Sequence, residues 1–242
     1  MKLIKLDAID STNDFLKGLA SKQNLENFTV VTAESQSKGK GQMGAVWTSE
    51  KSKNLIMSVL VKDVLCNIDS IFNLNIAVSL AVISVLEKYQ IPKLSIKWPN
   101  DIMSDSKKIG GILIENSIKS DGSIFSIVGL GLNVNQTNFE NLPKASSLEC
   151  VSATSFNISI LIQEIVSEMK EKTNHWPDSN SLHTKLYTQY LFKKEVPTAF
   201  SLPNGAAFMG IIQGVSSTGK LQVLLEDDTI QEFDIKEIQM LY

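Results

Sequence analysis

An apolar run from Leu74 to Leu86 sets the first limit on how this chain can fold. The run is about 13 residues long and contains Asn75, Ser79 and Ser84, so it is too short and too polar to cross a bilayer. Apolar residues recur around it at helical spacing, which predicts a long core helix from Asp69 to Tyr89. Its apolar positions are Phe72, Ile76, Leu80, Ile83 and Leu86.

Strand-like runs lie on both sides of this helix, without the regular strand–helix alternation of a doubly wound fold. They cover residues 3–9, 28–33, 55–61, 109–115 and 124–132. Asp10, Ser11 and Thr12 supply capping side chains for a short helix after the first run, and a second amphipathic helix is predicted at 155–172. We therefore predict an α+β fold with a mixed β-sheet.

The sequence changes character at about residue 193. Four short β-rich runs follow, at 206–213, 220–225, 229–234 and 237–241, separated by turn-forming residues. Seven acids and four lysines give this segment a net charge of −3, so residues 1–192 sum to zero. We predict two domains, 1–192 and 193–242, the second being a small β-barrel.

The charged residues and cysteines exclude several classes of protein. The chain has 23 basic residues, all lysine, against 26 acids, which argues against a nucleic-acid-binding protein. Without arginine, an anionic ligand must be bound by lysine ammonium groups, backbone N–H groups or a metal. Cys66 and Cys150 are far apart and exclude a disulfide framework or structural zinc site. No signal peptide is recognisable, so a cytoplasmic location without membrane binding is expected.

Residues 39–44 read Gly-Lys-Gly-Gln-Met-Gly and match the pattern GxGxxG. A dinucleotide-binding loop requires a helix directly afterwards, whereas residues 45–54 are polar and precede a strand. A Walker A motif requires Lys-Ser/Thr where Ala45 and Val46 stand. What remains is a glycine loop with lysines around it. It could surround an anionic ligand with backbone N–H groups, or be an ordinary solvated hairpin loop.

A second motif is the segment Lys97-Trp98-Pro99-Asn100-Asp101, which follows an apolar strand. Asp101 at a strand end could hold Mg²⁺ through an oxygen atom or a water molecule. Lys108 opens the next strand, and Gly110 and Gly111 leave space for a ligand beside the backbone. A β-turn followed by a glycine-softened edge strand is the alternative interpretation.

Gly129 and Gly131 lie two residues apart on another apolar strand. Because side chains alternate along a strand, this spacing clears one face of the sheet. The cleared face could be a wall for a flat ligand or a place where the sheet is closely packed.

Taken together, these segments resemble the biotin protein ligases. The resemblance rests on Asp10-Ser11-Thr12-Asn13, on the glycine loop between Gln36 and Trp47, on residues 97–101 and 108–113, and on Gly129 to Asn133, in the family's order. It implies a catalytic domain like that of lipoate ligases and class II aminoacyl-tRNA synthetases, followed by an SH3-like domain. It also implies that biotin and MgATP form biotinyl-5′-adenylate and pyrophosphate, after which biotin passes to a lysine of a biotin carboxyl carrier domain.

The resemblance gives a role to each matching residue. Lys108 would offset the repulsion between the biotin carboxylate and ATP, Lys40 would add positive charge, and Asp101 would hold Mg²⁺ and orient the acceptor amine. Biotin would contact Ser11, Thr12, Asn13, Gln36, Gly39, Lys40, Gly41, Gln42, Lys108, Gly111, Gly129 and Gly131. ATP would contact Lys40, Gln42, Trp47, Asn100, Lys108 and Asn133.

The chain also departs from the family. The family loop usually reads Gly-Arg-Gly-Arg, whereas this one has Lys40 and Gln42 in the arginine positions, which predicts a weaker hold on the adenylate. The Asp10-Ser11-Thr12-Asn13 segment lies too near the N-terminus for a preceding helix-turn-helix domain, so no DNA binding is expected. A lipoate or octanoate ligase and a non-catalytic biotin-binding protein are the alternatives, and a homodimer is left open.

Overall fold

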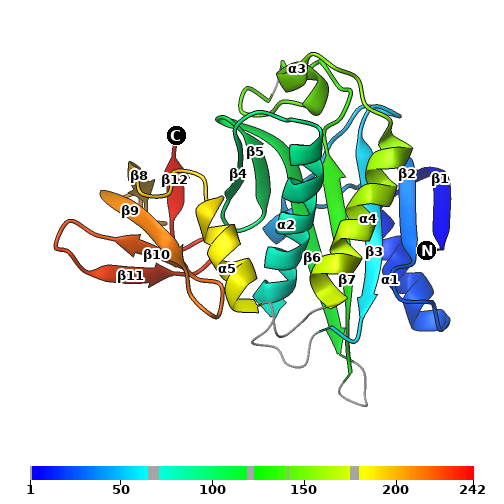
Figure 1. Ribbon diagram of the computed structural model, residues 1–242, viewed down its shortest axis with the longest axis horizontal. Helices are drawn as coiled ribbons and strands as arrows, with labels where there is room; N and C mark the ends of the chain where they lie inside the picture. Colours follow the sequence, from blue (N-terminus) through cyan, green and yellow to red (C-terminus); the bar gives the residue numbers. More distant parts are fainter. Residues whose placement is uncertain (1, 65–70, 119–122, 141, 175–179) are drawn as a thin grey trace.

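The computed structural model describes residues 2–64, 71–118, 123–140, 142–174 and 180–242. They form a seven-stranded sheet and a separate five-stranded sheet, with helices packed mainly on the large sheet (Figure 1). The strand order of the large sheet is β1-β2-β3-β7-β6-β5-β4. These strands are β1 (Leu3–Ile9), β2 (Val30–Gln36), β3 (Leu55–Lys62), β4 (Leu94–Lys97), β5 (Asp101–Ser104), β6 (Lys107–Ile118) and β7 (Ile124–Leu132).

The large sheet is mixed, which confirms the predicted fold class. β1 and β2 are parallel because the helix α1 (Thr12–Lys22) connects them, and the remaining neighbours are antiparallel. Two strand predictions need correction. The run at 28–33 begins and ends too early, since β2 spans Val30–Gln36. Residues 98–100 form a turn and Asp101 begins β5, so Asp101 lies at a strand end as predicted, whereas β6 lies between β7 and β5 and is not an edge strand.

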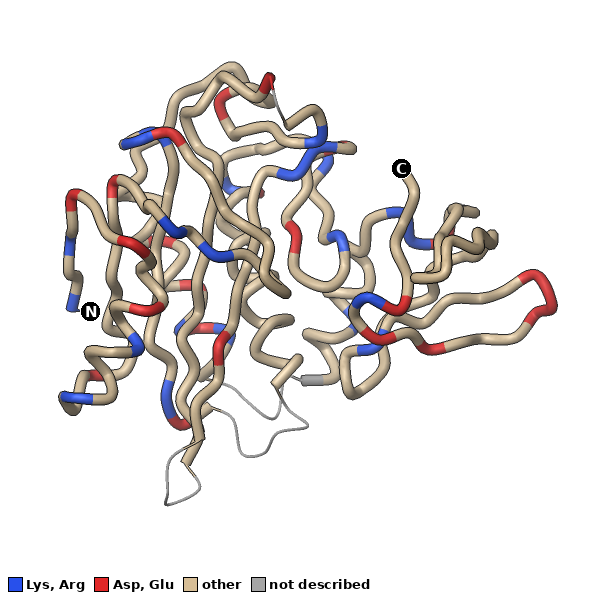
Figure 2. The backbone as a smooth tube through the Cα atoms, turned by 180° about the vertical axis from the view of Figure 1, so that it is seen from behind, with Lys and Arg blue, Asp and Glu red and all other residues tan. Residues whose placement is uncertain are grey.

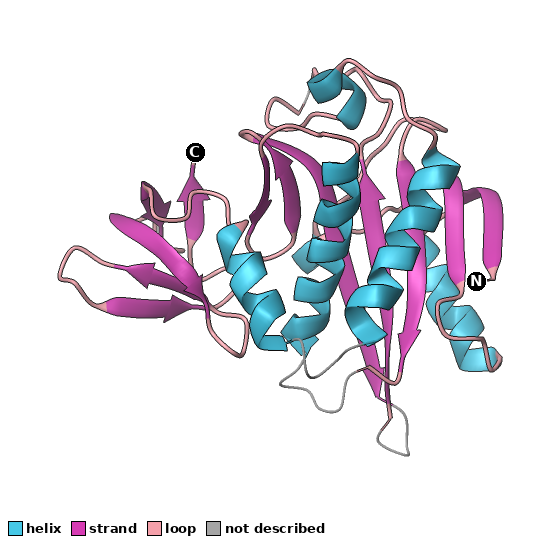
Figure 3. Cartoon of the chain, viewed as in Figure 1, coloured by secondary structure: helices cyan, strands magenta, loops and turns pink. Residues whose placement is uncertain are grey.

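Helices cover both faces of the large sheet (Figure 3). α2 (Ile71–Lys88) and α4 (Ile158–Asn174) pack on one face, with the short α3 (Leu148–Ser152) at one end of the sheet. Consecutive residues of β3 show how the faces separate: Val59 belongs to the core under α2 and α4, whereas Leu60 packs with Leu16 of α1.

α2 is the one helix of the described residues that is long and apolar enough to span a membrane, but 67% of its apolar window is buried inside the protein. That burial is the environment of a core helix, as the sequence predicted. Its observed bounds fall inside the predicted 69–89, whose residues 69 and 70 lie outside the described part of the chain, as does Cys66.

The second sheet is antiparallel, with the order β11-β10-β9-β8-β12. It follows α5 (Asn180–Gln189) and consists of β8 (Pro197–Ser201), β9 (Ala207–Val215), β10 (Leu221–Leu224), β11 (Ile230–Phe233) and β12 (Gln239–Leu241). The prediction of four strands missed β8. Figure 2 shows acidic residues at the tip of the β10–β11 hairpin, within the segment predicted to be acidic.

The second sheet contacts the large domain through a glycine. The Trp98 indole N–H donates to the carbonyl oxygen of Gly219 at 2.9 Å. Gly219 has φ +88°, and a Cβ added there would lie 2.2 Å from the Phe72 ring. Glycine is therefore required both by the backbone conformation and by the close approach to α2.

Candidate active site

A cavity of about 300 Å³ opens beside β6 and β7 of the large sheet. Its walls come from the β1–α1 junction, the glycine loop, the segment before β5, and the strands β3, β6 and β7. Fourteen residues predicted from the sequence line it: Ser11, Thr12, Asn13, Gln36, Lys40, Gly41, Gln42, Trp47, Asn100, Asp101, Lys108, Gly111, Gly129 and Gly131. The fold thus brings together motifs that are separated by more than a hundred residues in the sequence.

Two predicted contact residues, Gly39 and Asn133, do not line this cavity. Gly39 is buried where the loop closes on itself: its carbonyl accepts from the Trp47 N–H at 2.9 Å, and an added Cβ would lie 2.3 Å from the Trp47 carbonyl oxygen. Asn133 is also buried, and its side-chain amide donates to the Ser146 carbonyl at 2.9 Å. Both residues shape the surrounding loops and do not form the cavity surface.

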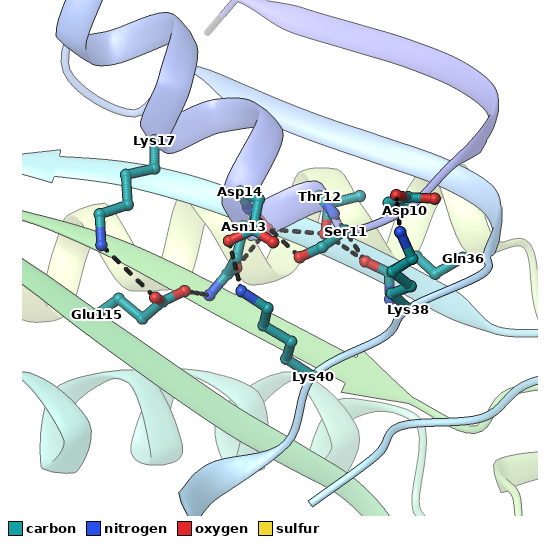
Figure 4. Close-up of polar contacts among 11 residues, drawn as sticks. Asp10, Ser11, Thr12, Asn13, Asp14, Lys17, Gln36, Lys38, Lys40 and Glu115 are labelled. Carbon is teal, nitrogen blue, oxygen red and sulfur yellow. Dashed lines mark hydrogen bonds and ion pairs between the residues drawn. The ribbon is translucent and has the colours of Figure 1, made fainter. Parts of the chain in front are cut away.

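A polar cluster forms where α1 begins (Figure 4). Ser11 caps the helix by accepting from the Asp14 N–H, and the N–H and hydroxyl of Thr12 both donate to Gln36 Oε1, at 2.7 and 3.1 Å. Asn13 Nδ2 donates to Glu115 Oε2 at 2.8 Å. Ser11, Thr12, Asn13 and Gln36, each of which was predicted to contact biotin, thus lie together in one polar cluster.

Ser58 belongs to the same cluster but was missed from the sequence. It is fully buried in β3, with Oγ 2.8 Å from Thr12 Oγ1 and 2.6 Å from Asn13 Oδ1. A buried hydroxyl needs hydrogen-bond partners, and here those partners are the side chains that line the cavity. The available signal was a polar residue within an otherwise apolar strand, Leu55–Lys62.

Two ion pairs tie the glycine loop to the start of α1, as Figure 4 shows. Lys38 Nζ lies 2.8 Å from Asp10 Oδ2, and Lys40 Nζ lies 2.6 Å from Asp14 Oδ1. The hydrogen bond to Asp14 raises the pKa of Lys40, and the one from Lys38 lowers the pKa of Asp10. Lys40 was predicted to add positive charge near the nucleotide. Its ammonium group instead contacts the Asp14 carboxylate, next to Ser11–Asn13.

At the other end of the cavity, Asp101 lies between two lysines. Its Oδ1 is 2.6 Å from Lys108 Nζ, and its Oδ2 is 3.7 Å from Lys97 Nζ. The side chains of Lys97, Asp101 and Lys108 are 24, 17 and 35% exposed, so solvent screens these charges only in part. Asp101 is the only carboxylate among the described residues that line the cavity.

The backbone before Asp101 is held by buried donors from distant helices. Asn75 Nδ2 of α2 and the Tyr187 hydroxyl of α5 both donate to the Pro99 carbonyl oxygen, at 2.7 and 3.0 Å. Complete burial raises the pKa of Tyr187, so its hydroxyl remains a neutral donor. Asn100 exchanges two hydrogen bonds with Ile112 of β6. Neither Asn75 nor Tyr187 lies in a recognisable motif, so sequence reasoning did not identify them.

The paired glycines of β7 clear the floor of the cavity. A Cβ at Gly129 would lie 2.5 Å from Asn13 Oδ1, and one at Gly131 would lie 2.4 Å from the Trp47 ring. The Trp47 indole N–H is buried, and it has no hydrogen-bond partner within the described part of the chain. A buried unpaired donor on a cavity wall is a group that a polar ligand atom could satisfy.

The described residues contain no cluster of three or more His, Cys, Asp or Glu side chains that could hold a metal ion. A magnesium ion bound here would thus depend on Asp101 and on oxygen atoms of a ligand. Such an arrangement is common where Mg²⁺ binds together with substrate phosphates.

Comparisons with known proteins agree with the motifs. Residues 6–135 match the sequence model of the Biotin/lipoate A/B protein ligase family. The chain is 28% identical over 215 residues to the biotin–[acetyl-CoA-carboxylase] ligase of Mycobacterium tuberculosis, which covers 87% of this chain and 79% of that protein. It is 32% identical over 169 residues to the bifunctional ligase/repressor BirA of Bacillus spizizenii, covering 68% of this chain and 51% of that protein. The chain thus spans about half the length of that bifunctional relative.

Among solved structures, the chain is similar to the biotin protein ligase from Aquifex aeolicus in complex with biotin and ATP. The TM-score is 0.81 at 25% identity, and the match covers 99% of this chain and 98% of that one. Both sheets are therefore included in the similarity.

Proposed function

The chain belongs to the Biotin/lipoate A/B protein ligase family, and from that premise we propose that it is an ATP-dependent biotin protein ligase. In the first step, a biotin carboxylate oxygen attacks the α-phosphorus of ATP and pyrophosphate leaves. In the second step, a lysine amine of a biotin carboxyl carrier domain attacks the biotinyl carbonyl carbon and AMP leaves. The relatives that match along most of the chain carry the name of biotin ligases, which favours biotin over lipoate.

One observation carries this proposal: a single cavity contains the Lys108–Asp101 pair at one end and the Ser11–Gln36 polar cluster at the other. The neutral, polar head group of biotin suits the hydroxyl and amide groups of Ser11, Thr12 and Gln36. Its flat ring system suits the floor cleared by Gly129 and Gly131. This orientation directs the carboxylate end of biotin toward Lys108.

Lys108 would then stabilise the reacting centre. Two anions approach each other when the carboxylate attacks ATP, and an ammonium group in a partly buried site offsets their repulsion more effectively than water does. Asp101 holds Lys108 in place before the reaction. In the second step Asp101 would orient the acceptor amine by accepting a hydrogen bond from it.

Mg²⁺ would be held by Asp101 together with phosphate oxygens of ATP, and it would supply charge neutralisation to the phosphates. The carrier domain would bring its lysine to the open side of the cavity. We expect the protein to act in the cytoplasm, without binding DNA or a membrane.

Biotin-dependent exchange of labelled pyrophosphate into ATP tests the first step without any carrier. We expect exchange with biotin and none with lipoate, and loss of exchange in Lys108→Ala. Exchange supported by lipoate would instead identify a lipoate ligase. Biotin binding by calorimetry without any exchange would identify a non-catalytic biotin-binding protein.

A further inference from the structure

A series of contacts connects the proposed reacting centre to the residue that follows β12. Asp101 contacts both Lys108 and Lys97, and Lys97 Nζ lies 5.3 Å from the centre of the Tyr242 ring. Lys144 Nζ lies over the same ring, at 4.3 Å. Tyr242 thus brings an aromatic face from the second sheet to two ammonium groups, one of which contacts the acid of the active site.

The Tyr242 ring has an aromatic neighbour as well as the two ammonium groups. It packs edge-on against Phe192, with ring centres 5.1 Å apart and planes at 69°. The side chain is partly buried, and the pKa of its hydroxyl is raised first by that burial and then by the Asp101 carboxylate. The phenol therefore stays neutral, and the electron-rich face of the ring stays available to a cation.

Lys97 needs such a contact to keep its place. Its Nζ is 3.7 Å from Asp101 Oδ2, which is an ion pair but is too long for a hydrogen bond. A lysine has four rotatable side-chain bonds, and one loose ion pair does not order them. The Tyr242 ring supplies a second contact, and it attracts the ammonium group without neutralising its charge.

We propose that Tyr242 is a positioning residue for the nucleotide: its ring holds the Lys97 ammonium group beside Asp101, where Lys97 attracts the phosphates of ATP. This inference rests on the proposed ligase function. It follows that the residue after β12, the last strand of the second sheet, completes the cationic side of the active site. The chain has no arginine, so no planar guanidinium group is available at this site. The aromatic ring orients a lysine in its place.

The effect should be specific to ATP. ATP and the departing pyrophosphate carry several negative charges, whereas biotin carries one, at its carboxylate. The residues that would recognise the biotin head group, Ser11 to Asn13 and Gln36, make their side-chain hydrogen bonds to one another and to Glu115 and Ser58, and none of these bonds involves Lys97 or Tyr242. A displaced Lys97 should therefore raise KM for ATP and leave the affinity for biotin alone unchanged.

Pyrophosphate exchange and calorimetry on the full-length chain test this inference. Tyr242→Leu removes the ring and should raise KM for ATP by about two- to thirty-fold, with a smaller change in kcat. Tyr242→Phe keeps the ring and should restore KM to within about two-fold of the original value. Tyr190→Leu is the matched control, because its hydroxyl donates to Glu87 and not toward Lys97. Calorimetry with biotin alone should give the same affinity for all variants.

Three outcomes would overturn the inference: an unchanged KM for ATP in Tyr242→Leu, an equal defect in Tyr242→Phe, or a parallel loss of biotin affinity. Lys97→Met keeps Tyr242 in place and must raise KM for ATP by itself, so an unchanged KM in that variant overturns the inference even if Tyr242→Leu does not fold. Absence of biotin-dependent exchange in the unmodified protein would instead contradict the proposed function.

Discussion

Replacing Gly129 with alanine should weaken biotin binding by displacing Asn13. The new Cβ would lie 2.5 Å from Asn13 Oδ1 and 3.1 Å from both Cγ and Nδ2. Asn13 cannot move aside freely, because Ser58 Oγ lies 2.6 Å from its Oδ1 and its Nδ2 donates to Glu115 at 2.8 Å. The substitution therefore breaks part of the polar cluster that would recognise biotin.

The size of the effect follows from these contacts. Ser58 keeps its contact with Thr12, so the loss of its neutral hydrogen bond with Asn13 costs about 1 kcal/mol. Loss of the Asn13 hydrogen bond to the Glu115 carboxylate costs about 1.5–3 kcal/mol more. The sum is roughly 2.5–4 kcal/mol, which would correspond to a loss of biotin affinity of about 70-fold to 1,000-fold if all of it affected binding. Part of this energy should also appear as a lower melting temperature.

Titration calorimetry with biotin and thermal unfolding measure both effects. Gly18→Ala is the matched control, since a Cβ at Gly18 of α1 meets nothing within 4 Å and should leave biotin affinity unchanged. Asn13→Ala removes the side chain that obstructs the new Cβ. If the reasoning is right, Gly129→Ala costs little more in that background; losses that simply add would refute it.

Three further predictions concern the loop and the pH response. Gln42→Arg should slow escape of the adenylate, because an arginine adds a charged hydrogen bond worth about 1–2 kcal/mol. The amount of adenylate released during turnover measures this effect, and unchanged release would contradict the prediction. Asp14→Lys breaks the ion pair with Lys40 and should speed biotin dissociation about two- to five-fold in stopped-flow measurements. Adding Lys40→Glu reverses the pair and should return the dissociation rate to its original value. If the double variant still dissociates fast, the ion pair does not hold the glycine loop. Burial, and secondarily Lys172, lower the pKa of His183, so the folded state binds its proton less readily than the unfolded chain does. The melting temperature should fall as pH drops below about 6.5, and His183→Gln should flatten that dependence if the assignment is correct.

The sequence predicted most of the cavity lining because these residues belong to short motifs. The spacing within each motif is set by local backbone geometry, such as the alternation of side chains along a strand. The two-residue spacing of Gly129 and Gly131 indicated a cleared strand face, and the structure places both glycines on the cavity floor. The fold class followed in the same way, from helical and strand periodicity. Lys108 and Asp101 lie in neighbouring motifs, so their pairing in adjacent strands needed little long-range information.

What could not be predicted depends on contacts between distant parts of the chain. Ser58 lies 45 residues from Asn13, and Tyr187 lies 88 residues from Pro99, so no local pattern indicates either hydrogen bond. The partner of Lys40 was also unpredictable, because a lysine can reach several acids and the fold decides which one is near. β8 was missed because its run, Pro197–Ser201, is short and begins with proline.

The approach of Gly219 to the large domain determines how the molecule should come apart when heated. The Trp98 indole N–H is bonded to the Gly219 carbonyl, and the Phe72 ring lies directly against Gly219. If the second sheet separated from the large sheet, the Phe72 ring and the Trp98 indole N–H would both become exposed to water. Calorimetric melting should accordingly show one cooperative transition in place of two, and either sheet excised with its helices should be prone to self-association.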